Sequence, residues 1–119
     1  MPDQHYEKLL AHQLVMNRET WKALQARGLT ESTKVRLDFA YDAPDKNSAE
    51  ALKALLQDKT DYEVATQGAE SLLRKSWTVV GTTKETIISP EVLDQWVTWM
   101  VIAGKEKGCD FDGWGTEVP

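Results

Sequence analysis

The sequence contains few of the residues on which catalytic and metal sites are built. Among its 119 residues are one cysteine, Cys109, and two histidines, His5 and His12. A single cysteine cannot form a disulfide within the chain, which is typical of a protein in a reducing compartment. The sequence also has no apolar run long enough to span a membrane and no apolar leader at its N-terminus. These absences argue against a membrane protein and predict a cytoplasmic one.

Positive charge is scarce as well. The chain has 14 basic residues against 19 acidic ones, which gives a net charge of −5. A protein that binds nucleic acid irrespective of base sequence needs a basic surface to displace counterions from the phosphates. Here the basic residues gather only at Arg74-Lys75, Lys105 and Lys107. We therefore expect no direct binding to RNA or DNA.

The composition, with 41% hydrophobic and 28% charged residues, is that of a folded globular protein. A chain of 119 residues can bury one core, so we expect residues 1–119 to form a single domain. A helix over residues 4–27 is expected first, because apolar residues recur three, four or seven positions apart and Gly28 can end the helix. This apolar face consists of Tyr6, Leu10, Leu14, Trp21 and Leu24.

Residues 34–42 alternate between apolar and polar, which predicts a half-buried strand. Its apolar face consists of Val35, Leu37, Phe39 and Tyr41. Pro44 ends the strand, and either Asp45 or Ser48 can cap a helix that ends near Asp58.

A second strand is expected around residues 62–66 and a third over residues 76–84, with Gly81 as the site of a bulge. Residues 67–75, which include Leu72 and Leu73, fit either a loop or a helical turn. A serine cap at Ser89 followed by Pro90 then predicts a helix from Glu91 to Lys107.

The last residues of the chain predict a fourth strand. Phe111 lies between Asp110 and Asp112, which is the period-two pattern of a strand. Glycine weakens a strand interior but is tolerated where the backbone bends, so we expect the strand to bend at Gly113-Trp114-Gly115. The charges and the bend favour a position at the edge of a sheet.

This order of elements predicts an α+β fold with a ferredoxin-like βαββαβ core over residues 34–118. Such a core is a four-stranded antiparallel sheet with two helices on one face, and here an extra N-terminal helix precedes it. Right-handed crossovers place the first and third strands at the centre of the sheet and the other two at its edges.

No catalytic, metal-binding or cofactor-binding residues are predicted. His5 and His12 are interpreted as surface or boundary residues, and Cys109 as a packing residue without a nearby base. The best carboxylate cluster joins Asp38 to the two aspartates that flank Phe111, and we expect Arg36 to pair with one of them. The sequence therefore predicts a protein that is not an enzyme and needs no cofactor.

The helix over residues 91–107 has an unusually wide apolar arc of roughly 200° at 100° per residue, whereas one sheet needs a stripe of little more than 100°. The arc runs from Trp99 through Val92, Trp96, Met100 and Leu93 to Val101. Its excess predicts packing against the first helix through Trp21 and Leu24, or a protein interface. A homodimer is left open by this pattern.

Three segments also carry a resemblance to a known family. They are residues 17–41, residues 61–64, and residues 96–116, which end in Asp112-Gly113-Trp114-Gly115-Thr116. Together they resemble the regulator of ribonuclease E activity B (RraB) family. The resemblance implies a ferredoxin-like fold and a non-enzymatic regulator that binds ribonuclease E and reduces its activity. It assigns no catalytic residue.

Two hypotheses follow. The first is a protein-binding regulator, with ribonuclease E as the partner that the resemblance names, which binds through Asp110, Asp112, Trp114, Glu117 and Trp99. The alternative is a small-molecule sensor, or an enzyme, that uses the open sheet face or a pocket near Trp77 and Trp114. A flat acidic face would favour the regulator, and a deep apolar pocket with converging polar groups would favour the alternative.

Overall fold

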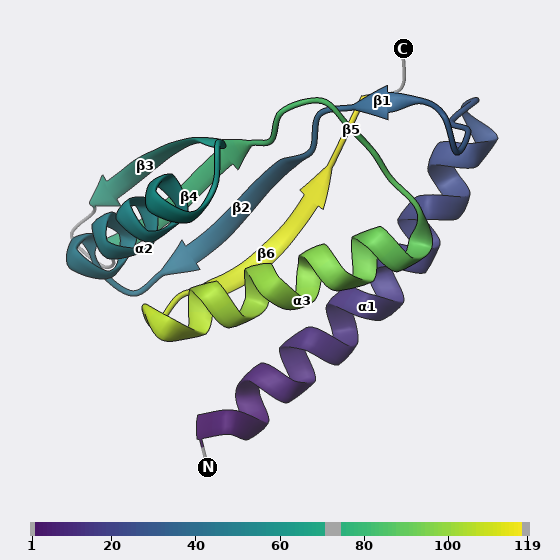
Figure 1. Cartoon of the computed structure of the whole chain (residues 1–119). Coiled ribbons are helices and arrows are strands. Elements are labelled where there is room, and N and C mark those ends of the chain that lie inside the picture. Colours follow the sequence, from purple (N-terminus) through teal and green to yellow (C-terminus); the bar gives the residue numbers. More distant parts are fainter. Residues whose placement is uncertain (1, 71–74, 118–119) are drawn as a thin grey trace.

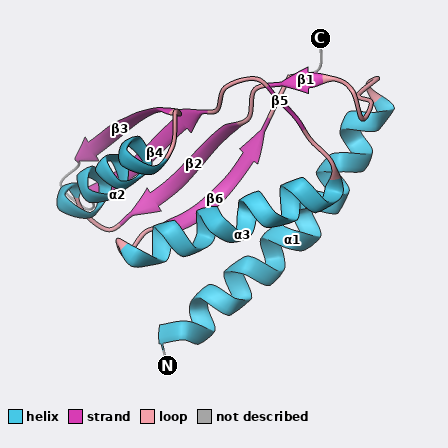
Figure 2. Ribbon diagram, viewed as in Figure 1, coloured by secondary structure: helices cyan, strands magenta, loops and turns pink. Residues whose placement is uncertain are grey.

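The computed structural model describes residues 2–70 and 75–117, in which three helices are accompanied by two antiparallel sheets (Figures 1 and 2). In chain order the elements are α1 (Pro2–Ala26), β1 (Lys34–Val35), β2 (Asp38–Ala43), α2 (Lys46–Lys59), β3 (Glu63–Glu70), β4 (Lys75–Thr82), β5 (Thr86–Ile87), α3 (Pro90–Glu106) and β6 (Asp110–Gly115).

The larger sheet has four strands in the order β3-β4-β2-β6. The strands that the sequence placed at the centre, β2 and β4, are the central ones, and the final strand lies at an edge as expected. Helices α2 and α3 lie on the same face of this sheet (Figure 1). Between them and the sheet lies a core that includes Tyr41, Val79 and Phe111, all fully buried.

The expected ferredoxin-like arrangement is confirmed only in part, because the chain forms a second sheet. The segment predicted as one strand over residues 34–42 is divided, and its first part pairs with β5 to form a two-stranded sheet. The division lies at Leu37, whose backbone N–H donates to Thr83 Oγ1 and whose carbonyl accepts from the Thr83 N–H. These bonds hold Leu37 against the segment that follows β4, so the strand does not continue through it.

The hairpin of β3 and β4 differs from the expectation in two ways. Strand β3 continues to Glu70, and residues 71–74 of the segment left open by the sequence lie outside the described residues. The bulge expected at Gly81 is wrong, since Gly81 pairs in regular register with Phe39 and with Val64. A Cβ at this position would meet the Phe39 ring and approach the Glu63 carbonyl oxygen to 2.5 Å, so glycine is needed here for close packing.

The bulge lies instead where β2 meets β6. Ala40 is opposite Gly113 while Tyr41 is opposite Phe111, so one extra residue, Asp112, is accommodated in β6. Gly113 has φ of 146°, which side-chain-bearing residues rarely adopt. The predicted bend near the end of the chain is therefore confirmed, and it begins at Gly113.

The helix ends follow the sequence signals closely. The Asp45 side chain accepts from the Ser48 N–H at 2.7 Å, which settles the choice of cap for α2 in favour of Asp45. Ser89 caps α3 by accepting from the Val92 N–H at 3.2 Å, with Pro90 in the first turn. These caps satisfy backbone donors that have no partner within the helix.

Helix α1 packs against α3 and along the free edge of β6 (Figure 1). The wide apolar arc of α3 is partly explained by this contact, because Trp21 and Leu24 share a buried cluster with Leu93. At the sheet edge, Gln13 Nε2 donates to the carbonyl oxygens of Phe111 and Asp112. Helix α1 thus supplies hydrogen bonds to an edge that would otherwise face water or another strand.

Candidate protein-binding surfaces

Three carboxylates gather on the sheet face that the helices leave open. Asp42 of β2 lies opposite Asp110 of β6, and Asp112 follows on the same strand. The expected cluster with Asp38 is wrong, because the antiparallel register places Asp38 opposite Gly115. Asp38 instead accepts a hydrogen bond from Thr82 at 2.8 Å. The bulge and the direction of pairing decided which aspartate joins the cluster.

The other two carboxylates of this cluster disfavour the ionised form of Asp42. Partial burial, followed by the charges of Asp112 and Asp110, raises the pKa of Asp42 above its usual value. His5 of α1 lies against the cluster, with Nε2 at 2.9 Å from Asp110 Oδ2. In the described part of the chain, the expected partner Arg36 forms no ion pair with these aspartates. Like charges placed this close repel one another when they are ionised.

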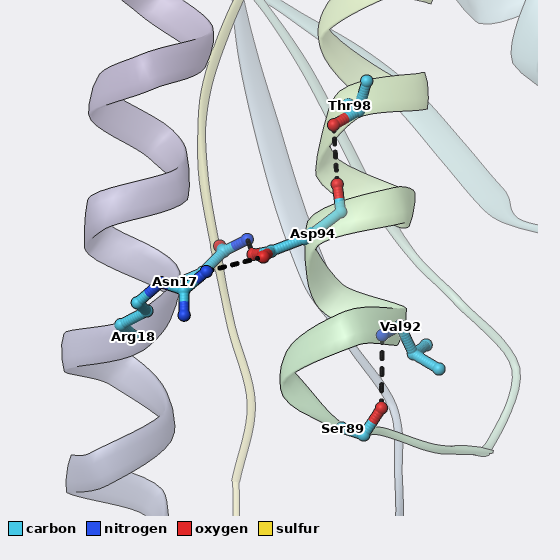
Figure 3. A network of polar contacts seen from close by, with 6 residues as sticks. All are labelled: Asn17, Arg18, Ser89, Val92, Asp94 and Thr98. Carbon is cyan, nitrogen blue, oxygen red and sulfur yellow. Dashed lines mark hydrogen bonds and ion pairs between the residues drawn. The ribbon is translucent and has the colours of Figure 1, made fainter.

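Trp114 points the other way, toward the helices. Its indole N–H donates to Asn17 Oδ1 at 2.7 Å, and its ring meets Trp96 edge-on at 6.3 Å between centroids. Asn17 in turn donates to Asp94 of α3 at 3.2 Å, and Arg18 reaches the other oxygen of that carboxylate at 3.1 Å (Figure 3). Trp114 therefore connects β6 to α1 and α3, and its indole N–H is already occupied.

The remaining predicted residues lie apart from one another. Glu117 is exposed just beyond β6, whereas Trp99 lies on the side of α3 that faces away from the sheet. The five predicted residues consequently do not form one continuous surface. The structure brings Asp110 and Asp112 together and separates them from Trp99.

The outer side of α3 is a second candidate surface. Its side chains Val92, Trp99 and Ile102 are 42%, 39% and 51% exposed. Ile102 was missed by the sequence analysis. In a helical projection at about 100° per residue, Ile102 falls opposite the residues that contact the sheet. Its exposure could therefore have been predicted from the sequence.

The thiol of Cys109 is poorly placed to act as a nucleophile. Cys109 is fully buried, and burial together with Asp110 and Asp45 raises the pKa of its thiol to about 11. Within residues 2–70 and 75–117, no group of histidine, cysteine and carboxylate side chains is arranged to hold a metal ion. In the same residues, no helix combines the length and the apolar character that crossing a membrane requires.

The two tryptophans expected to border a pocket lie apart in the sheet. Trp77 of β4 is opposite Ala43 of β2, whereas Trp114 of β6 is opposite Phe39 of β2. Ala43 and Phe39 are about 13 Å apart along β2. The Trp77 ring lies near Lys46 Nζ, 5.9 Å from its centroid. A hollow of about 260 Å³ lies elsewhere, with Leu37, Ile88, Leu93 and Trp96 among its lining residues.

The family assignment rests on nearly the whole chain. The family model described as regulator of ribonuclease activity B matches residues 15–116. The chain belongs to this family. The match includes residues 15–26 of α1, both sheets, α2, α3 and the bulged end of β6, which confirms the resemblance seen in the sequence. A search of curated proteins finds no match. As a member of the RraB family, the chain is a regulator of ribonuclease activity.

Proposed function

We propose that this RraB-family protein regulates ribonuclease E in the cytoplasm by binding it as a protein partner, without catalysing a reaction itself. The observation that carries this proposal is the family match over residues 15–116 of a 119-residue chain. Regulation by contact also suits a chain whose histidines lie on the outside and whose cysteine is buried.

The charge of the protein supports a basic protein partner over RNA. The net charge is −5, and on the open sheet face partial burial, with the charges of Asp112 and Asp110, raises the pKa of Asp42. On that face the central strands carry Ala40, Thr78 and Val80, which offer no aromatic ring for a base to stack on. An acidic surface accelerates encounters with a basic region of a protein and repels phosphates.

In this proposal the acidic face supplies the electrostatic part of binding. Asp110 and Asp112 lie on it, and Glu117 extends the negative charge beyond the strand. Trp114 contributes indirectly, because its bond to Asn17 holds β6 against α1. Trp99 contributes from the outer side of α3, as a separate contact.

The test uses purified ribonuclease E and measures both its binding to the protein and its cleavage of an RNA substrate. The parent protein should bind the enzyme and slow cleavage. The double variant Asp110→Asn, Asp112→Asn should bind about tenfold more weakly and with a smaller dependence on salt. Asp58→Asn is the matched control, since Asp58 is exposed on α2 and outside the proposed surface.

Two results would contradict the proposal. One is a parent protein that neither binds ribonuclease E nor changes its cleavage rate. The other is a double variant whose affinity and salt dependence equal those of Asp58→Asn, which would remove the acidic face from the binding surface.

The small-molecule alternative has less support. The hollow beside Trp96 has a volume of about 260 Å³, slightly below the roughly 300–1,000 Å³ of typical ligand sites. Its floor is apolar, and its charged residues, Asp61, Lys84 and Glu85, are of both signs. These features suit an inserted apolar side chain better than a charged metabolite.

A further inference from the structure

Basic side chains surround a hollow at the small sheet of β1 and β5, which lies beyond one end of the larger sheet (Figure 1). This basic hollow has a volume of about 740 Å³ and is open to solvent. It is lined by Lys34, Arg36, Lys84, Glu85, Thr86 and Ile87. Three of these six residues are basic and one is acidic, in a chain whose net charge is −5. The hollow therefore concentrates positive charge on an acidic protein.

Hydrogen bonds between distant segments bring these cations together. The alternation that buries Leu37 turns Lys34 and Arg36 toward solvent. Lys84 follows Thr83, which exchanges two hydrogen bonds with Leu37 although 46 positions separate them in the sequence. The bonds that divide the first predicted strand thus also assemble the cluster. The sequence analysis missed it for that reason.

The three cations have no anionic partner within the described part of the chain. Lys34, Arg36 and Lys84 are all exposed, and there none of their side chains takes part in an ion pair or a hydrogen bond. The nearby Asp38 accepts a hydrogen bond from Thr82 instead. An anionic ligand placed among the three cations would gain attraction from each of them without displacing an existing partner.

An apolar side chain among the cations favours a peptide over a nucleic acid. Ile87 is 47% exposed, and its register opposite Lys34 places both side chains on the same face of the small sheet. A segment that carries an apolar residue between carboxylates can therefore use both kinds of contact. RNA would find no aromatic ring among the lining residues on which to stack a base.

A second copy of the chain fits this hollow poorly. It would have to offer the acidic cluster of its open sheet face, where Asp110 already contacts His5 at 2.9 Å. The large apolar side chains that are exposed in the described residues lie on α1, β5 and α3, and not on that sheet face. The copy would therefore bring no apolar side chain to Ile87. Such a contact between two different surfaces also does not close into a dimer.

We propose that the basic hollow binds an acidic segment of a protein partner. Carboxylates of that segment meet Lys34, Arg36 and Lys84, and one of its apolar side chains packs on Ile87. Exposed ion pairs are individually weak, so the contact is weak and is lost as salt rises. The inference goes beyond the proposed function, because it adds a basic contact to the acidic face. Its test does not need ribonuclease E, so either can fail alone.

The probe is a short synthetic peptide with a central leucine and glutamates on both sides of it. One control peptide has glutamine in place of the glutamates, and another has serine in place of the leucine. At low salt, fluorescence anisotropy should show that the probe binds at least about tenfold more tightly than the glutamine peptide. It should bind about threefold more tightly than the serine peptide. Amide shift changes in NMR should map to residues 34–37 and 84–87.

Variants of the protein locate the contact. The double variant Arg36→Gln, Lys84→Gln should weaken the probe at least about fivefold, because it removes two of the three cations. Lys8→Gln, Lys22→Gln is the matched control, since it removes the same charge from exposed positions of α1 outside the hollow. Ile87→Ser should weaken the probe and leave the serine peptide unchanged. Thermal unfolding of each variant confirms that it is folded.

Four results would overturn the inference. The glutamine peptide could bind as tightly as the probe, or the two double variants could lose affinity equally. A single-stranded RNA of the same net charge could bind as tightly as the probe. The chain could also associate with itself in sedimentation, in a way that both Arg36→Gln, Lys84→Gln and Asp110→Asn, Asp112→Asn abolish.

The two proposals remain distinguishable. Probe binding by a protein that neither binds ribonuclease E nor changes its cleavage rate would support the basic hollow and contradict the proposed function. Binding of ribonuclease E without binding of the probe would do the reverse.

Discussion

The indole N–H of Trp114 donates to Oδ1 of Asn17 across 2.7 Å, although 97 positions separate the two residues in the sequence. Asn17 is 2% exposed, and its amide nitrogen donates to Asp94 of α3. One buried side chain of α1 thus connects the last strand to the last helix, and Figure 3 shows its contact with Asp94 of that helix. The tryptophan of the terminal Asp-Gly-Trp-Gly segment has a structural role.

Trp114→Phe is expected to destabilise the protein by about 1–3 kcal/mol, because it leaves Oδ1 of Asn17 buried without a donor. Urea denaturation at equilibrium measures this loss. Trp99→Phe is the control, as the same change at an exposed side chain should shift stability by less than about 0.5 kcal/mol. Equal effects of the two substitutions would show that the bond to Asn17 does not stabilise the fold.

Gly81→Ala is expected to destabilise the protein by about 1–3 kcal/mol, because its Cβ would press on the Phe39 ring and on the Glu63 carbonyl oxygen. The backbone carbonyl cannot move aside without disturbing the pairing of β3 with β4. Gly115→Ala is the matched control, since a Cβ there meets nothing within 4 Å. Thermal unfolding compares the two, and a tolerated Gly81→Ala would contradict the close packing at this strand crossing.

Asp42→Asn is expected to stabilise the protein at neutral pH and to have no effect at acid pH. The folded state raises the pKa of Asp42, so the ionised carboxylate costs stability above that pKa, and the cost disappears as pH falls through it. After solvent screening the gain should be a few tenths of a kcal/mol. Urea denaturation at both pH values tests it, with Glu31→Gln in an exposed turn as control. Stabilisation that persists at acid pH would have another cause.

The thiol of Cys109 is expected to react slowly in the folded protein. It is fully buried, and its pKa of about 11 leaves little thiolate at neutral pH. Labelling with a chromogenic disulfide reagent should be at least about a hundredfold slower in buffer than in denaturant. Comparable rates in the two conditions would mean that the end of α3 opens readily.

Local signals in the sequence predicted the elements well. The Ser89-Pro90 start of α3, the Asp45 cap of α2 and the alternation that buries Val35, Leu37, Phe39 and Tyr41 were all readable, because caps and periodicity depend on neighbours along the chain. The two-residue strands of the second sheet could not be predicted from the sequence. They are too short to show a pattern, and they depend on the bonds between Leu37 and Thr83.

The residues of the candidate surfaces could be named from the sequence, but their neighbours and their exposure could not. Asp110 and Asp112 were recognised as an acidic pair, but their true neighbour is Asp42, because the register of two distant strands decides which carboxylates meet. Trp114 was predicted to bind a partner, whereas its indole N–H donates to Asn17 of α1. The exposure of Trp99 and Ile102 depends on how much of α3 is covered by α1.

By itself, the sequence determined the helices, most of the strands, the order of the four-stranded sheet and the family. These follow from side-chain periodicity and capping, which act over a few residues. Only the tertiary structure decided the β6 bulge, the inward direction of Trp114 and the uncovered strip on α3. Each of these depends on packing and hydrogen bonds between segments that are far apart in the chain. A pattern among neighbouring residues does not contain that information.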